Sequence, residues 1–214
     1  DTDNGPALLA DYLKDAKVIG VDKNMPARFL IPVQDSVNAK YVLGSLCVDE
    51  VRMQKDDEEK ALMFKASEMN DTAMAEVKRL LATDKTEIEM DEALLAYYKS
   101  LGASGHSFSP IMGYGANGAN PHHSCDDSRL KPGDSIIVDM GCIYEGYCSD
   151  MTRTFFYKKY PDAEAERVYN LVRAANEEST KLCGPGTVIS TIDKKARDII
   201  IEGGYGEDFT HRLG

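Results

Sequence analysis

The sequence has no apolar stretch that approaches the ~20 residues of a membrane-spanning helix. It also lacks an opening basic head followed by an apolar core, the pattern of a secretory signal. Positive charge is scarce, because 25 lysines and arginines face 36 aspartates and glutamates, which gives a net charge of −11. Nucleic acids and anionic membranes require a basic surface, so this balance argues against both as partners.

The sequence lacks the residue patterns of paired cysteines and of a nucleotide-binding loop. The five cysteines are odd in number and show no Cys-x-x-Cys spacing, so reduced thiols in a cytoplasmic protein are expected. The glycine-rich stretch 113–119 has no lysine and no helix signal after it, which argues against a nucleotide-binding loop.

What the chain does contain is a pair of aspartates in a β-hairpin pattern. An apolar run ends at Asp139, residues 145–146 offer turn chemistry, and residues 147–156, which include Asp150, are typical of a returning strand. If the loop is 144–145, Asp139 lies directly opposite Asp150 on the same face. A loop at 145–146 restores that pairing only with a one-sided bulge.

Carboxylates that lie this close oppose each other's ionisation unless a cation is present. Two divalent ions about 3.5–4 Å apart fit between such groups. The alternative is a pair of solvated surface aspartates. Asp139, however, interrupts an apolar strand without a local charge partner, and an unpaired buried charge is costly. The pattern therefore favours cation binding.

Several motifs in a fixed order resemble one family. They are Asn117-Gly118-Ala119-Asn120-Pro121-His122-His123, Leu130-Lys131-Pro132-Gly133-Asp134, the hairpin with Asp150-Met151-Thr152-Arg153-Thr154-Phe155, Ala196-Arg197, Gly203-Gly204-Tyr205-Gly206 and His211-Arg212-Leu213-Gly214. Together they resemble the metallopeptidases of the pita-bread fold, in particular the Xaa-Pro dipeptidase and aminopeptidase P branch, which is related to methionine aminopeptidase.

The resemblance implies an α+β fold. Residues 53–214 are expected to form the N-terminal half of a pita-bread (creatinase/aminopeptidase) catalytic domain. Residues 1–52 are expected to form the C-terminal part of an α/β non-catalytic N-terminal domain. A homodimer is compatible with this organisation.

The resemblance also implies a dinuclear centre of manganese, cobalt, iron or zinc ions, whose activated water hydrolyses the peptide bond before proline in a peptide substrate. Asp139 and Asp150 match two of five metal ligands, and Thr152 and Thr154 are expected to orient these carboxylates. The other three ligands are expected beyond Gly214, so the 214-residue chain alone is expected to be inactive.

Two histidines match family positions that contact the substrate or the tetrahedral intermediate. On the residues alone, His122 and His123 follow Pro121 in an extended or turn segment, which is typical of a solvated loop. By resemblance His122 and His211 become catalytic candidates. His123 has no match and is interpreted as structural.

Other functions stay open. A methionine aminopeptidase-like hydrolase shares the fold and the ligands, but the long sequence before the first catalytic helix and Pro121-His122-His123 favour the Xaa-Pro branch. A non-catalytic binding protein and a metal-free creatinase-like hydrolase of the same fold are disfavoured, because Asp139 and Asp150 are both present.

Local signals place the helices and strands. Capping boxes are predicted at Asp56 with Glu59 and at Thr86 with Glu89, and Asp162 is a predicted N-cap. The expected helices cover 6–14, 26–33, a long segment after Asp56, a segment that ends at Gly102, 162–183 and 189–202. Strands are expected at 17–21 and 38–46.

Overall fold

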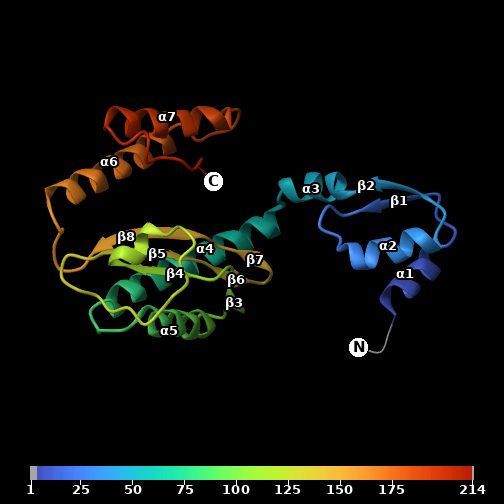
Figure 1. The fold of residues 1–214 in the computed structure, drawn as a ribbon, viewed down its shortest axis with the longest axis horizontal. Helices are drawn as coiled ribbons and strands as arrows, with labels where there is room; N and C mark the ends of the chain where they lie inside the picture. Colours follow the sequence, from blue (N-terminus) through green and yellow to red (C-terminus); the bar gives the residue numbers. More distant parts are fainter. Residues whose placement is uncertain (1–3, 214) are drawn as a thin grey trace. The chain divides into compact units, whose positions relative to one another are not determined.

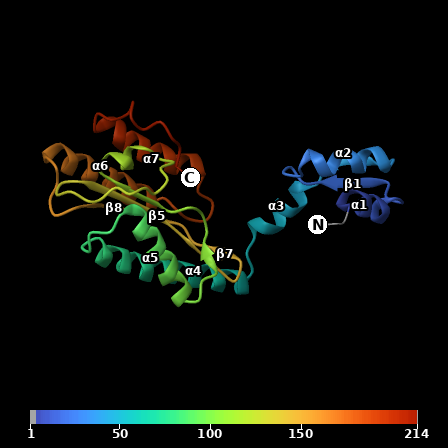
Figure 2. The same ribbon diagram turned by 60° about the horizontal axis from the view of Figure 1, so that its bottom comes forward.

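The computed structural model describes residues 4–213 (Figures 1 and 2). The chain divides into two compact units, Asp1–Ala61 and Leu62–Gly214, with the division inside helix α4 (Asp57–Leu80). The expected domain boundary at 52–53 falls at the end of helix α3 (Ser45–Met53) and stays a prediction. Within residues 4–213, no helix is both long and apolar enough to cross a membrane.

The first unit alternates helices and strands as predicted. Its elements are α1 (Gly5–Leu13), β1 (Val18–Val21), α2 (Ala27–Ser36), β2 (Lys40–Leu43) and α3. The strands pair in parallel, with Val18 opposite Lys40. Their side chains and those of the helices bury a small core around Ile19, Val33 and Val37.

The strand expected at 38–46 is shorter than predicted, and its last residues begin a helix instead. β2 ends at Leu43 and α3 starts at Ser45. Gly44 lies so close to Gly20 that an added Cβ would come within 3.0 Å of the Gly20 backbone. The Ser45 hydroxyl accepts a hydrogen bond from the Lys23 N–H at 2.6 Å. These tertiary contacts turn the chain where the apolar pattern alone suggested a continuing strand.

The second unit places helices on both sides of a small antiparallel sheet (Figure 1). Its remaining elements are α5 (Glu87–Ser100), β3 (Gly105–His106), β4 (Ile111–Tyr114), the 3₁₀ helix η1 (Gly115–Ala119), β5 (Ser135–Met140), β6 (Cys142–Tyr144), β7 (Tyr147–Cys148), β8 (Met151–Phe156), α6 (Ala163–Thr180) and α7 (Ile189–Glu202). Strands β4, β5 and β8 form one sheet, and β3, β6 and β7 form another. Helices α4 and α5 cover one side of the β4–β5–β8 sheet, and α6 and α7 lie on the other side.

The core of this unit lies between the sheet and α4 and α5. Along β5, Ile136, Val138 and Met140 are buried in a cluster with side chains such as Met90 and Leu94 of α5. Each fully buried side chain of this size contributes about 1.5–3 kcal/mol. Because side chains alternate along a strand, Ile137 and Asp139 point to the opposite face.

The predicted caps are confirmed. Glu59 N–H and Asp56 N–H each bond the other residue's carboxylate at 2.9 Å. Thr86 and Glu89 form the same reciprocal pair at 3.1 and 2.8 Å. Asp162 Oδ1 accepts from the Ala165 N–H at 2.8 Å at the start of α6. These contacts lie within four residues of chain, which is why local sequence sufficed to find them.

Candidate metal centre

The hairpin that carries the two aspartates turns at Glu145-Gly146. Both residues have positive φ, 47° and 85°, as expected of a two-residue type I′ turn. Tyr144 therefore faces Tyr147, and Asp139 faces Thr152.

The prediction that Asp139 lies directly opposite Asp150 is wrong. No one-sided bulge is present between these strands, because regular pairing is interrupted by two residues on each strand, 141–142 and 149–150. The register is consequently the same on both sides of the interruption. Asp150 precedes Thr152 by two positions on the returning strand, which makes it a diagonal neighbour of Asp139.

The diagonal arrangement still brings the two carboxylates into electrostatic contact. Partial burial raises the pKa of Asp150, and the negative charge of Asp139 raises it further. The Thr152 hydroxyl donates a hydrogen bond to Asp139 Oδ1 at 2.6 Å. Two neighbouring oxygen donors with unfavourable mutual charge fit a hard or borderline divalent cation, although they form only part of a first shell.

Thr154 lies on the same strand face as Thr152. It pairs with Ile137 rather than with an aspartate. Among residues 4–213, no hydrogen bond joins its hydroxyl to Asp139 or Asp150. Its expected orienting role stays a prediction.

Close glycine contacts place η1 on the sheet face that carries Asp139. Gly113 of β4 faces Ile137. An added Cβ on Gly113 would lie 2.9 Å from the Gly118 Cα, and one on Gly118 would lie 3.3 Å from Ile137 Cδ1. Because Ile137 and Asp139 share a face, the segment that continues to His122 starts on the aspartate side of the sheet.

His122 is exposed at the end of this segment. Its backbone N–H donates to Asn120 Oδ1 at 3.0 Å. In the described part of the chain, no hydrogen bond or ion pair links its side chain to Asp139 or Asp150.

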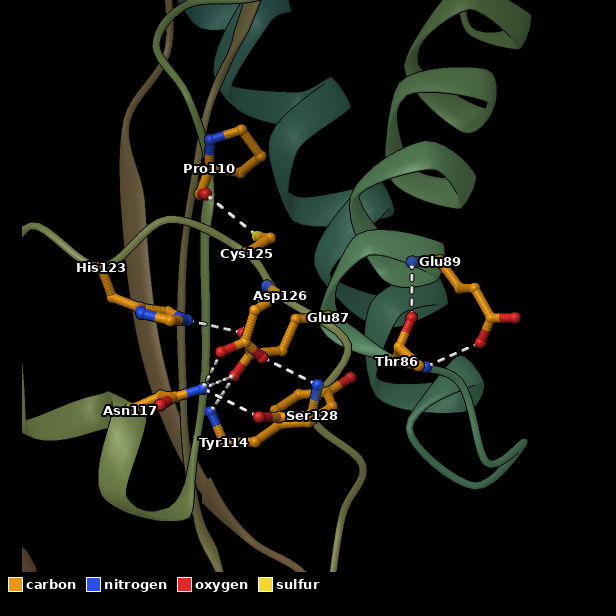
Figure 3. Close-up of polar contacts among 10 residues, drawn as sticks. All are labelled: Thr86, Glu87, Glu89, Pro110, Tyr114, Asn117, His123, Cys125, Asp126 and Ser128. Atoms are coloured by element: carbon orange, nitrogen blue, oxygen red, sulfur yellow. Dashed lines mark hydrogen bonds and ion pairs between the residues drawn. The ribbon is translucent and has the colours of Figure 1, made fainter.

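The next residue behaves differently, and sequence reasoning missed its partner. His123 Nε2 lies 2.6 Å from Oε2 of Glu87, a carboxylate with 0% side-chain exposure (Figure 3). The structural role expected for His123 thus takes the form of a buried ion pair or hydrogen bond. One signal could have revealed Glu87. It stands at helical spacing from the buried Met90 and Leu94, so it is a carboxylate on the apolar face of α5.

Glu87, His123 and Asp126 offer metal-type donor atoms within 4.8 Å of one another. Both Glu87 oxygens, however, already accept two hydrogen bonds each. A metal there would have to displace these bonds inside a buried site. We therefore interpret the cluster as a hydrogen-bond network rather than as the metal centre.

His211 lies in the segment that follows α7, and it is exposed. The Arg197 guanidinium of α7 donates to Phe209 O at 2.7 Å and to His211 O at 3.2 Å. Asp193 accepts from the Leu213 N–H at 2.9 Å and pairs with Arg197 at 3.2 Å, contacts that lower the pKa of Asp193. Two side chains from one helix thus hold the backbone on both sides of His211.

Replacing Arg197 with methionine is expected to loosen this segment without unfolding α7. Hydrogen bonds to charged groups contribute about 1.5–3 kcal/mol each, so amide exchange at Leu213 is expected to accelerate about tenfold. Hydrogen exchange followed by NMR measures this. Lys194→Met, which removes an exposed cation from the same helix, is the matched control. Equal acceleration of exchange in both variants would contradict a role of Arg197 in holding the segment around His211.

Comparisons with known proteins agree with this architecture. The model of metallopeptidase family M24 matches residues 61–214, well over half of the chain. The chain belongs to metallopeptidase family M24. The probable dipeptidase PepE of Mycobacterium bovis is 32% identical over 218 residues, which cover 100% of this chain and 57% of PepE.

Solved structures match the M24 chain across both units. The prolidase from Pyrococcus horikoshii superposes with a TM-score of 0.93 at 27% identity, over 99% of this chain and 61% of the prolidase. The Xaa-Pro dipeptidase from Bacillus anthracis gives a TM-score of 0.88 at 26% identity, over 99% and 60%. The predicted α+β fold of the pita-bread type is confirmed. The chain spans about half the length of the curated relatives it matches.

Proposed function

We propose that the intact protein is a metal-dependent peptidase that hydrolyses the bond before proline in Xaa-Pro substrates. The observation that carries the proposal is the hairpin of an M24 chain, which sets Asp139 and Asp150 on one side with mutually repelling charges. The likeness to a prolidase and to an Xaa-Pro dipeptidase supports the choice of substrate.

In this proposal Asp139 and Asp150 hold two divalent ions together with ligands outside the described residues. When bound, such ions polarise the substrate carbonyl and make a hydroxide available near neutral pH. The Thr152 hydroxyl donates a hydrogen bond to one oxygen of Asp139. That contact restricts the orientation of the carboxylate, the usual task of a residue behind a metal ligand.

His122 and His211 would contact the substrate. Both side chains are exposed. The backbone of the His122 segment is held by the buried Glu87, and that of the His211 segment by the ion-paired Arg197. An imidazole donor placed near the scissile carbonyl stabilises the negative charge that develops on its oxygen. The orienting role of Thr154, a homodimer, a cytoplasmic location and a centre of two manganese, cobalt, iron or zinc ions stay predictions.

Chelation of the intact protein is expected to abolish hydrolysis of an Xaa-Pro dipeptide, and reloading with manganese, cobalt, iron or zinc to restore it, because in this proposal the divalent ions supply the attacking hydroxide. Steady-state assays with the Xaa-Pro dipeptide, the matching Xaa-Ala dipeptide and a peptide with N-terminal methionine separate the candidates. Preference for the methionine peptide would favour a methionine aminopeptidase-like enzyme. Chelator-resistant activity would contradict metal dependence, and inactivity of every reloaded sample would favour a binding protein.

A further inference from the structure

We propose that Glu87 is a positioning residue for His122. Through His123, its buried carboxylate holds the segment 114–126 in the conformation that presents His122 to a substrate. This inference rests on the proposed function, because it assigns the role to a residue of the same site.

The hydrogen-bond partners of the Glu87 carboxylate all belong to one segment of the chain, 114–126 (Figure 3). Its Oε1 accepts from the Tyr114 N–H at 2.8 Å and from Asn117 Nδ2 at 2.9 Å. Its Oε2 lies 2.6 Å from His123 Nε2 and accepts from the Asp126 N–H at 3.0 Å. A buried carboxylate is costly unless its lone pairs are used. Here all four partners come from one stretch of chain.

The start of α5 binds the same stretch through its backbone. The N–H groups of a first helical turn have no partner inside the helix. Glu87 N–H donates to Ser128 O at 3.3 Å, and Ile88 N–H donates to Asp126 O at 3.2 Å. The segment is thus anchored to α5 by side-chain and main-chain contacts together, while Thr86 and Glu89 keep the helix start in place.

His122 sits between two anchors. On one side, Asn120 accepts from the His122 N–H through Oδ1 at 3.0 Å and from the His123 N–H through its carbonyl at 3.1 Å. On the other side is the His123 side chain, which is only 11% exposed and is held by Glu87. The neighbouring imidazoles therefore face different environments. A shift of the inward His123 has to move the outward His122.

Glu87→Gln separates positioning from folding. Glutamine has the same size, but its amide nitrogen donates where a carboxylate oxygen accepted, so two of the four donors lose their acceptor. The capping box and the two main-chain contacts do not use the Glu87 side chain and remain. Glu92→Gln is the matched control, because Glu92 is an exposed carboxylate on the same helix.

The experiment measures kcat and KM of the intact, metal-loaded protein for an Xaa-Pro dipeptide in wild-type and His122→Ala backgrounds. A misplacement of about 1 Å can cost about 100-fold in rate. Glu87→Gln is expected to lower kcat about 10- to 100-fold with little change in KM and in metal content. In the His122→Ala background the same change is expected to lower kcat less than about twofold, because the residue being positioned is gone.

An equal loss in both backgrounds would overturn the proposal, as would an unaltered kcat. If Glu87→Gln does not fold, His123→Leu, which removes only one of the four donors, replaces it. Its kcat and KM are measured in the wild-type and His122→Ala backgrounds, and the same results support or overturn the proposal. If no reloaded wild-type sample hydrolyses an Xaa-Pro bond, the proposed function fails separately. Amide hydrogen exchange at His122 then tests whether Glu87 positions this residue. Faster exchange in Glu87→Gln than in Glu92→Gln supports the proposal, and equal exchange overturns it.

Discussion

Replacing Asp150 with asparagine in the intact protein is expected to lower Xaa-Pro hydrolysis by more than about 100-fold, since even residues behind a metal ligand are worth 10- to 100-fold. The amide keeps the shape of the side chain but lacks the negative charge that a divalent ion requires. Metal content measured on the purified protein is expected to fall in parallel. Asp127→Asn, the same change at another exposed aspartate of the second unit, is the control. Full activity of Asp150→Asn would reject the assignment of this residue as a ligand.

The same substitution is expected to stabilise the metal-free protein. Partial burial and the charge of Asp139 raise the pKa of Asp150 in the folded state. A carboxyl whose pKa is higher in the folded than in the unfolded state favours folding when the pH is below its unfolded-state pKa. This contribution is lost as the pH rises through the folded-state pKa. At neutral pH the ionised group therefore opposes folding, and asparagine removes that penalty.

Urea denaturation in the presence of a chelator measures this effect. The stability gain of Asp150→Asn over wild type is expected at about pH 7 and is expected to disappear at about pH 3, below the usual aspartate pKa. Asp127→Asn is not expected to reproduce the pattern. A gain of the same size at both pH values would show that charge repulsion at Asp150 is not its origin.

Replacing Gly141 with alanine is expected to destabilise the second unit by about 3 kcal/mol or more, the upper part of the range for overpacking. An added Cβ would overlap the Ser149 carbonyl oxygen and Ser107 Oγ. Ser107 also donates to that carbonyl at 2.8 Å, so the three groups are held together. The backbone must move, and it lies between the two candidate ligands. Denaturant unfolding monitored by circular dichroism gives the free energy of unfolding.

Gly105→Ala provides the matched control for this prediction. Gly105 lies in β3 beside β6, and an added Cβ there meets no atom within 4 Å. Its substitution is expected to change the free energy of unfolding by less than about 1 kcal/mol. Similar losses in the two variants would mean that strand conformation, rather than the close approach at Gly141, sets the cost. Metal affinity is expected to fall in Gly141→Ala only.

Features that depend on neighbours in the sequence could be predicted from it. The caps at Asp56, Thr86 and Asp162 use partners three residues away, and all three are present. The turn at 145–146 was one of two loops that the residues allowed. Choosing between them required the sheet, because Asp139 pairs with Thr152 when both strands carry the same number of residues between the turn and that pair.

The sequence by itself determined the family, the two aspartates and the two histidines as candidates, since these depend on residue types in a fixed order. The tertiary structure alone decided how those residues are held. Glu87 is buried because α5 packs beside β4, and its four partners are brought to it by a chain reversal that local propensity does not encode. Arg197 likewise finds Phe209 and His211 only after the chain folds back past α7. A buried charge selects its partners by geometry and desolvation, and both exist only in the folded chain.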